Sequence, residues 1–249
     1  MARRLINAVR RIMSRFRKSD TQVLTGREYW EDRVLKYGRR SVLNIKHSED
    51  EYEQVTALQK ARLFTILASQ LNGREKVALD FGCGPGRFTP DLADLIRGNS
   101  IGVDPIPQFL EMAPKKDKAE YLLLENQVIP MADASADVVW VCLVLGGITE
   151  ENELGQTARE INRVLKSDGL LFLVENTTDA PSVAHWKFRP FESYEKLCSF
   201  APLRYLSDYY DAGERISIMA GRKAPSRTEE PLVLEETAEV GSIQIMAEE

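Results

Sequence analysis

The chain has 249 residues, of which 43% are hydrophobic, and a formal net charge of −5. This length and apolar content allow one substantial core, so we expect one domain with appendages. The cysteines Cys83, Cys142 and Cys198 are an odd and scattered set, which excludes a disulfide framework and a CxxC metal site and favours a reducing, cytoplasmic compartment.

The first 18 residues carry the most uneven charge. They contain seven Lys and Arg and no acid, so the segment is +7 and the remainder of this −5 chain is −12. Apolar side chains at helical spacing predict a basic amphipathic helix over residues 1–18. Three roles fit such a helix. It could bind peripherally to the inner face of an anionic membrane, serve as a mitochondrial presequence, or pack on the domain. The acidic remainder has no second basic patch, so we expect no nucleic-acid partner.

A helical region precedes the first strand. Residues 27–38 and 51–71 show helical periodicity, and we assign residues 19–72 to an N-terminal helical cap. The longest apolar run, residues 138–148, is far shorter than the roughly 20 residues of a membrane-spanning helix. It therefore predicts a core strand.

A glycine-rich turn follows the first strand. The chain reads KVALDFGCGPGRF from Lys76 to Phe88, a buried strand followed by a turn in which Gly82, Gly84 and Gly86 alternate with other residues. Glycine allows positive φ and a close ligand approach, and the next helix offers free amides, so we expect a nucleotide-type ligand. An NAD-binding G-x-G-x-x-G would need glycine at Arg87, which weakens an oxidoreductase interpretation. The alternative is that these glycines form an ordinary surface turn without a ligand.

Two acids accompany this turn. Asp80 stands two residues before the first glycine and suits a cationic group, so the ligand should carry an amine. Asp104, followed by Pro105, ends the second strand IGVDP, roughly 20 residues after the turn, where a βαβ unit places a carboxylate on a ribose diol. The alternative role for Asp104 is to cap the next helix.

The turn resembles motif I of the class I S-adenosylmethionine-dependent methyltransferases, an acid, any residue, then G-C-G-x-G. The match comprises Asp80, Gly82, Cys83, Gly84 and Gly86. The resemblance implies an α/β, Rossmann-like fold over residues 73–222, with a seven-stranded, mostly parallel sheet, helices on both faces and a terminal antiparallel hairpin at residues 203–222. It also implies S-adenosylmethionine as cofactor.

Two later segments resemble the same family. Residues 120–145 are similar to its third and fourth strands, and this similarity assigns Glu125, Asn126 and Leu143 to the cofactor site, with Glu125 and Asn126 facing the adenine. Many relatives have glycine then aspartate where this chain has Leu124 and Glu125, and a solvated loop acid is the alternative for Glu125. Residues 160–175 resemble the family's last helix, turn and fifth strand. Here we expect Gly169 to end the turn and an apolar face formed by Leu154, Ala158, Ile161 and Leu165.

The sequence says least about the residues that contact the methyl acceptor. His185, in the segment that usually contacts the acceptor, is nominated as base or acceptor-positioning residue, with an ordinary loop histidine as the alternative. Gly146 and Gly147 stand where many relatives carry a histidine, which removes a base or makes room for a bulky acceptor. Tyr29, Trp30 and Tyr37 could line the acceptor mouth, although packing residues are the commoner case. No carboxylates and histidines show metal-ligand spacing, so no metal is expected.

These features together predict an enzyme that transfers a methyl group from S-adenosylmethionine to oxygen or nitrogen of a small-molecule, lipid or glycan acceptor. If residues 1–18 bind membranes, a lipid-linked or glycan precursor is favoured. The alternative is a catalytically inactive adaptor that binds S-adenosylmethionine. The acidic residues 223–249 continue no domain pattern and are expected to be disordered.

Overall fold

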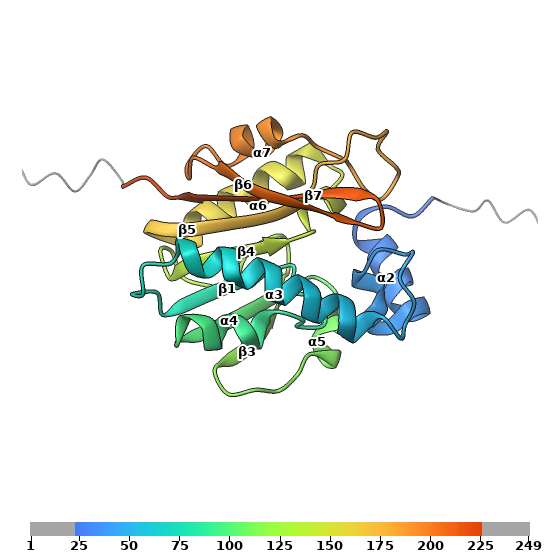
Figure 1. Ribbon diagram of the computed structural model, residues 1–249, viewed down its shortest axis with the longest axis horizontal. Helices are drawn as coiled ribbons and strands as arrows, with labels where there is room; N and C mark the ends of the chain where they lie inside the picture. Colours follow the sequence, from blue (N-terminus) through green and yellow to red (C-terminus); the bar gives the residue numbers. More distant parts are fainter. Residues whose placement is uncertain (1–22, 226–249) are drawn as a thin grey trace, which may run out of the picture.

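The computed structural model describes residues 23–225, which form one seven-stranded sheet in the order β3-β2-β1-β4-β5-β7-β6 (Figure 1). The strands are β1 (Val77–Phe81), β2 (Asn99–Asp104), β3 (Ala119–Leu123), β4 (Ala136–Cys142), β5 (Leu165–Asn176), β6 (Arg204–Asp211) and β7 (Glu214–Arg222). The first five strands run parallel, and β7 is antiparallel to both β5 and β6. The predicted mostly parallel sheet with a terminal antiparallel hairpin is confirmed.

Helices cover both faces of the sheet. They are α2 (Gly26–Tyr37), α3 (Tyr52–Gln70), α4 (Thr89–Ile96), α5 (Pro107–Met112), α6 (Glu151–Val164) and α7 (Phe191–Leu197), with short 3₁₀ helices η1 (Gly38–Val42) and η2 (Leu145–Gly147). Successive strand residues point to opposite faces, so Trp140 packs with α3 and α4, whereas Val141 packs with α6 and α7. The predicted apolar face is buried: Leu154, Ala158 and Ile161 on α6 are at most 6% exposed, and Leu165, the first residue of β5, is 0% exposed.

The turn between α6 and β5 differs from its sequence-based prediction. Strand β5 begins directly after α6, at Leu165, which pairs with Ala136 before a register shift in the β4–β5 ladder. Asp168, with φ +60°, makes the turn within the irregular start of the strand. Gly169 lies inside β5, where an added Cβ would come within 2.8 Å of the Lys166 carbonyl oxygen. The expectation that Gly169 ends the turn is therefore wrong.

The segment from α2 to the start of α3 lies at one end of the sheet (Figure 1). His47 Nε2 is 2.6 Å from Asp211 Oδ1, and Lys46 Nζ donates to the Ala212 carbonyl oxygen at 2.7 Å, so this segment is bonded to the β6–β7 turn. Val34 of α2 packs with Ile106, the N-cap of α5, and with Phe109 of α5. The second half of α3, with Leu63 and Leu67, packs in the same core cluster as the sheet strands. The division of the chain into a cap and a core stays a prediction.

Both predicted tails lie largely outside the described residues. The basic helix at residues 1–18 falls there entirely, as does the acidic tail from residue 226 onward. Lys223, the first residue assigned to that tail, donates to the carbonyl oxygens of Asn162 and Leu165. Among residues 23–225, no helix combines the length and apolar character needed to cross a membrane.

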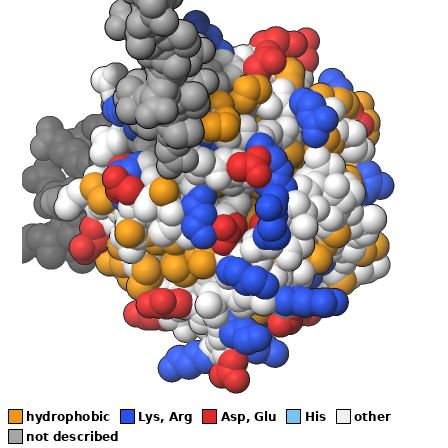
Figure 2. Space-filling model, turned by 90° about the vertical axis from the view of Figure 1, so that its left-hand side faces the viewer, with side chains coloured by type: hydrophobic (Ala, Val, Ile, Leu, Met, Phe, Trp, Pro, Cys, Tyr) orange, Lys and Arg blue, Asp and Glu red, His pale blue; other side chains and the backbone are white. Residues whose placement is uncertain are grey.

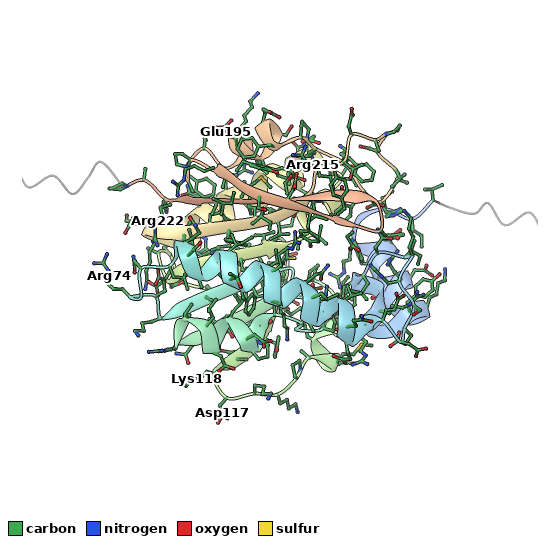
Figure 3. The ribbon with its side chains drawn as sticks, viewed as in Figure 1. Arg74, Asp117, Lys118, Glu195, Arg215 and Arg222 are labelled. Carbon is green, nitrogen blue, oxygen red and sulfur yellow. The ribbon has the colours of Figure 1, made fainter. Side chains whose placement is uncertain are left out.

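The face of the molecule opposite α2 carries basic, acidic and apolar side chains side by side (Figure 2). Arg222 and Arg74 lie at this end of the sheet (Figure 3). The Arg222 guanidinium donates to the Gln70 carbonyl oxygen at 2.8 Å and to Glu75 at 3.2 Å. These bonds fasten the end of β7 to the segment between α3 and β1.

Candidate active site

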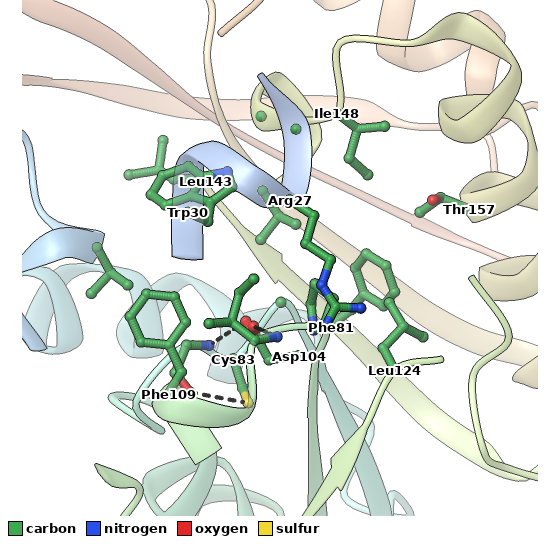
Figure 4. Close-up of a pocket in the computed structure, with 18 of the residues that line it drawn as sticks. Arg27, Trp30, Phe81, Cys83, Asp104, Phe109, Leu124, Leu143, Ile148 and Thr157 are labelled. Carbon is green, nitrogen blue, oxygen red and sulfur yellow. Dashed lines mark hydrogen bonds between the residues drawn. The ribbon is translucent and has the colours of Figure 1, made fainter. Parts of the chain in front are cut away.

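A cavity of about 560 Å³ opens at the carboxyl ends of β1, β2 and β4, a size typical of small-molecule sites (Figure 4). The sheet side contributes the strand ends and the glycine loop, and the opposite side is formed by α2 and η1. Eight of the predicted cofactor residues line it, namely Asp80, Gly82, Cys83, Gly84, Asp104, Pro105, Asn126 and Leu143. Gly86, Glu125 and His185 are not among the lining residues.

The glycine loop needs glycine for two separate reasons. Gly82, Gly84 and Gly86 all have positive φ, between +53° and +71°. An added Cβ at Gly82 would lie 2.5 Å from Val144 Cγ2, and one at Gly84 would lie 2.9 Å from Val42 Cγ1. The loop backbone is therefore packed between the segment after β4 and the 3₁₀ helix η1, at the floor of the cavity.

Asp104 bonds to the glycine loop and to the residue that precedes α5, and its contact with a ribose stays a prediction. Its Oδ2 accepts the Gly84 amide and its Oδ1 accepts the Ile106 amide, each at 2.9 Å, and Ile106 is the N-cap of α5. Burial raises the pKa of Asp104 to about 6. The two hydrogen bonds oppose this shift, because they favour the charged form. Each oxygen keeps a lone pair free to accept a ligand hydroxyl in the cavity.

Asp80 is the second buried acid of the cavity, 2% exposed. Its Oδ2 accepts a hydrogen bond from the Thr89 hydroxyl at 2.6 Å, at the first residue of α4. Burial, reinforced by the nearby charge of Asp104, raises the pKa of Asp80 to about 7. A cationic ligand group would favour the ionised form of both acids, so the cavity is chemically suited to one.

The loop after β3 makes a third wall. Asn126 and Gln127 have φ of +51° and +60°, in a tight turn that the Val128 amide closes on the Glu125 carbonyl oxygen at 2.9 Å. Leu124, Asn126 and Gln127 line the cavity, whereas Glu125 does not. The turn thus presents Asn126 and Gln127 to the cavity, and a contact of Glu125 with the adenine stays a prediction.

Glu175 is a site residue that the sequence reasoning missed. This carboxylate stands on the penultimate residue of β5 and is fully buried. It accepts hydrogen bonds from the amides of Val144 at 2.9 Å, Leu145 at 2.7 Å and Gly146 at 3.3 Å. Burial raises its pKa to about 7, opposed by these three bonds. Glu175 therefore fixes the segment that carries Leu143, a lining residue with φ +58°. An acid directly after the apolar run LLFLV is the signal that could have revealed it.

Aromatic rings occupy the space beside the glycines after β4. An added Cβ at Gly146 would lie 2.3 Å from Trp186 Cε2, and one at Gly147 would lie 3.2 Å from Trp30 Nε1. Trp30 lines the cavity, and the His185 ring stacks on Tyr29 with centroids 3.9 Å apart. Burial, with the charge of Arg33, lowers the pKa of His185. Gly146 therefore accommodates the Trp186 indole, whereas Gly147 lines the cavity beside Trp30.

The fold and the glycine loop together match the class I S-adenosylmethionine-dependent methyltransferases, the class to which the comparisons find this chain similar. Residues 79–173 match a family described as a methyltransferase domain. S-Adenosylmethionine is the cofactor of this family.

Curated relatives are similar over part of their length. The chain is 32% identical over 178 residues to malonyl-[acyl-carrier protein] O-methyltransferase of Legionella pneumophila, covering 68% of this chain and 58% of that protein. It is 32% identical over 133 residues to demethylmenaquinone methyltransferase of Lactobacillus johnsonii, covering 48% of this chain and 53% of that protein. The chain therefore spans less than two thirds of either relative.

A solved structure shares the fold. Phosphoethanolamine N-methyltransferase 1 of Haemonchus contortus, in complex with phosphoethanolamine and S-adenosylhomocysteine, superposes with a TM-score of 0.58 at 19% identity, covering 82% of this chain and 49% of that one. At this identity the likeness concerns the fold alone.

Proposed function

We propose that the protein transfers a methyl group from S-adenosylmethionine to a small-molecule acceptor bound in the cavity. The observation that carries the proposal is the hydrogen bond between the glycine loop and Asp104, the buried carboxylate at the end of β2. Asp104 accepts one backbone amide on each oxygen and still faces the cavity. The malonyl-carrier and demethylmenaquinone methyltransferases to which the chain is similar support methyl transfer.

The lining residues fit the parts of the cofactor. Asp104 would accept from the ribose hydroxyls, and the turn at Asn126 and Gln127 would face the adenine. Gly82 and Gly84 allow the amino-acid end to approach the backbone, and Asp80 supplies negative charge for its amine. When bound, the cofactor supplies a methyl group already activated by its sulfonium charge. The protein then needs mainly to align the acceptor with that methyl and to exclude water.

The proposal about the methyl acceptor rests on the apolar residues that line the cavity. Trp30, Phe109, Leu143 and Ile148 line the cavity, which suits an acceptor with an apolar or planar body. We propose oxygen or nitrogen as the methylated atom, on a small-molecule, lipid or glycan acceptor. Attachment to a membrane through residues 1–18 remains part of the proposal and concerns residues outside the described range.

His185 as catalytic base also remains a proposal. Its ring stacks on Tyr29 and stands outside the cavity lining, so it would act from the rim. His185→Phe keeps a ring for the stack and removes the base. If His185 takes a proton from the acceptor, this variant loses about 10²-fold or more in kcat with KM for S-adenosylmethionine unchanged. An unchanged kcat assigns His185 to packing.

The function is tested by binding and then by turnover. Calorimetric titration of the full chain with S-adenosylmethionine, S-adenosylhomocysteine and NAD should show saturable binding of the two sulfur compounds only. Malonyl-carrier protein and demethylmenaquinone, chosen from the relatives, head an acceptor panel in which S-adenosylhomocysteine release is measured. Binding without release on any acceptor would favour the adaptor role, and binding of NAD alone would contradict the proposal.

A further inference from the structure

Arg87, directly after the glycine loop, has a buried guanidinium with few partners. It is 9% exposed and lines the cavity. Its Nε donates to the Thr56 hydroxyl at 3.1 Å and its Nη2 donates to the Gln59 side-chain oxygen, both neutral acceptors on α3. A guanidinium has five N–H donors. Within residues 23–225, three of these five therefore have no hydrogen-bond acceptor from the protein.

The charge of Arg87 is also unpaired. No carboxylate oxygen of the described residues lies within 4.0 Å of its nitrogens, the limit for an ion pair. Arg189, equally buried at 9% exposed, instead donates to Glu151 at 3.1 Å and to two carbonyl oxygens at 3.0 Å each. Buried charges in folded proteins are normally paired. Arg87 thus has no carboxylate in direct contact. The charges of Asp80 and Asp211 act on it only at longer range, and the cavity is the side from which a direct partner can come.

Arg87 is held in place without such a direct partner. Its Cζ lies 4.8 Å from the ring centroid of Phe88 and 5.9 Å from that of Tyr52, within the range of cation–π attraction. With the two bonds to α3, these rings fix the guanidinium before any ligand arrives. A preorganised donor of this kind is what planar carboxylate recognition requires.

We propose that Arg87 is the anion-binding residue of the cavity and takes a carboxylate of the bound ligand. The proposal rests on the proposed function, since it places the carboxylate in the same cavity. Asp80, also buried there, forms no ion pair with Arg87 within 4.0 Å, so one cavity presents separate sites for a cation and an anion. The carboxylate can come from the amino-acid end of the cofactor or from an acid-bearing acceptor.

Two nucleoside probes separate the anion site from the rest of the cavity. S-Adenosylhomocysteine carries the amino-acid end, and 5′-methylthioadenosine keeps the adenosine and thioether but lacks both charges. If the cofactor supplies the carboxylate, Arg87→Met weakens S-adenosylhomocysteine binding roughly 10- to 100-fold and leaves 5′-methylthioadenosine binding within about twofold. Arg87→Lys, which keeps the charge and loses the planar fork, recovers part of the affinity.

A third probe tests whether the acceptor supplies the carboxylate. Malonate, a free dicarboxylate, is titrated into protein saturated with S-adenosylhomocysteine. If the acceptor supplies the carboxylate, wild type binds malonate, Arg87→Met does not, and the variant binds S-adenosylhomocysteine normally. Equal weakening of both nucleosides by Arg87→Met, or no effect on any of the three probes, overturns the proposal.

Thermal unfolding without ligand controls for a structural role. Removal of an unpaired buried charge should leave the Tm of Arg87→Met unchanged or higher, whereas Arg189→Met, which removes a paired arginine, should lower it. A loss of Tm in Arg87→Met as large as in Arg189→Met also overturns the proposal. If wild type binds neither nucleoside, the proposed function fails by itself. Malonate titration of ligand-free wild type and Arg87→Met then decides the anion site: binding that requires Arg87 supports it, and its absence overturns it.

Discussion

Replacing Glu175 by glutamine should change how the stability of the protein depends on pH. In Glu175→Gln the side-chain oxygen can keep the two short bonds from the Val144 and Leu145 amides, at 2.9 and 2.7 Å in the wild type. The long bond from Gly146, at 3.3 Å, is lost because the new NH₂ group cannot accept it. The variant therefore keeps the shape of the site and removes the titrating group.

The magnitude follows from the pKa of this buried acid. Burial raises the pKa of Glu175 from 4.5 to about 7. Between these pH values the folded protein keeps the proton that the unfolded chain has released, so the wild type loses stability as pH rises. Each pKa unit corresponds to about 1.4 kcal/mol, which gives a total of about 3 kcal/mol above pH 7. Below pH 4.5 both states are protonated, and the contribution vanishes.

Urea unfolding followed by circular dichroism between pH 4.5 and 8 measures this effect. The free energy of unfolding of Glu175→Gln minus that of wild type should rise by about 3 kcal/mol across this range. Glu195→Gln, at an exposed position on α7 (Figure 3), is the matched control and should give a flat difference. A flat difference for Glu175→Gln as well would refute the reasoning.

Three further substitutions test the site. Gly82→Ala places a side chain at a positive φ and against Val144, so it should lower the free energy of unfolding in urea by about 1–3 kcal/mol. Gly213→Ala is its control, because Gly213 has φ +89° but open space around it, and it should lower the free energy of unfolding less. Asp104→Asn should weaken S-adenosylhomocysteine binding roughly tenfold or more by calorimetry, and unchanged affinity would remove Asp104 from the ribose site. Gly146→Ala should lower Tm and shift tryptophan fluorescence by displacing Trp186, and an unaltered spectrum would contradict the packing.

Local patterns in the sequence were enough for the sheet and the glycine loop. The glycine turn, the acid at Asp104 and the final hairpin each depend on residues close together in the chain, and the family resemblance supplied the seven-stranded, mostly parallel sheet. The turn before β5 was misplaced because its geometry depends on pairing of Leu165 with Ala136, which lies in a different strand.

The unpredicted parts of the site depend on contacts between distant segments. Glu175 bonds to amides about 30 residues earlier, Arg87 bonds to Thr56 and Gln59 on α3, and Trp186 covers Gly146. In the sequence, Arg87 was informative only as the residue that breaks a dinucleotide motif. One sequence does not indicate which of its distant residues meet, so burial and pairing of such groups needed the structure.

The bonds between the α2–η1 region and the β6–β7 turn bear on the speed of the catalytic cycle. Trp30 and Val42 form a wall of the cavity that belongs to a segment outside the sheet, and His47 fastens that segment to Asp211. A product that contacts this wall would leave more easily if the segment moved outward, and such a movement would break the bond to Asp211. We therefore expect product departure, and not methyl transfer, to limit steady-state turnover, with a burst of the first product in rapid-mixing experiments.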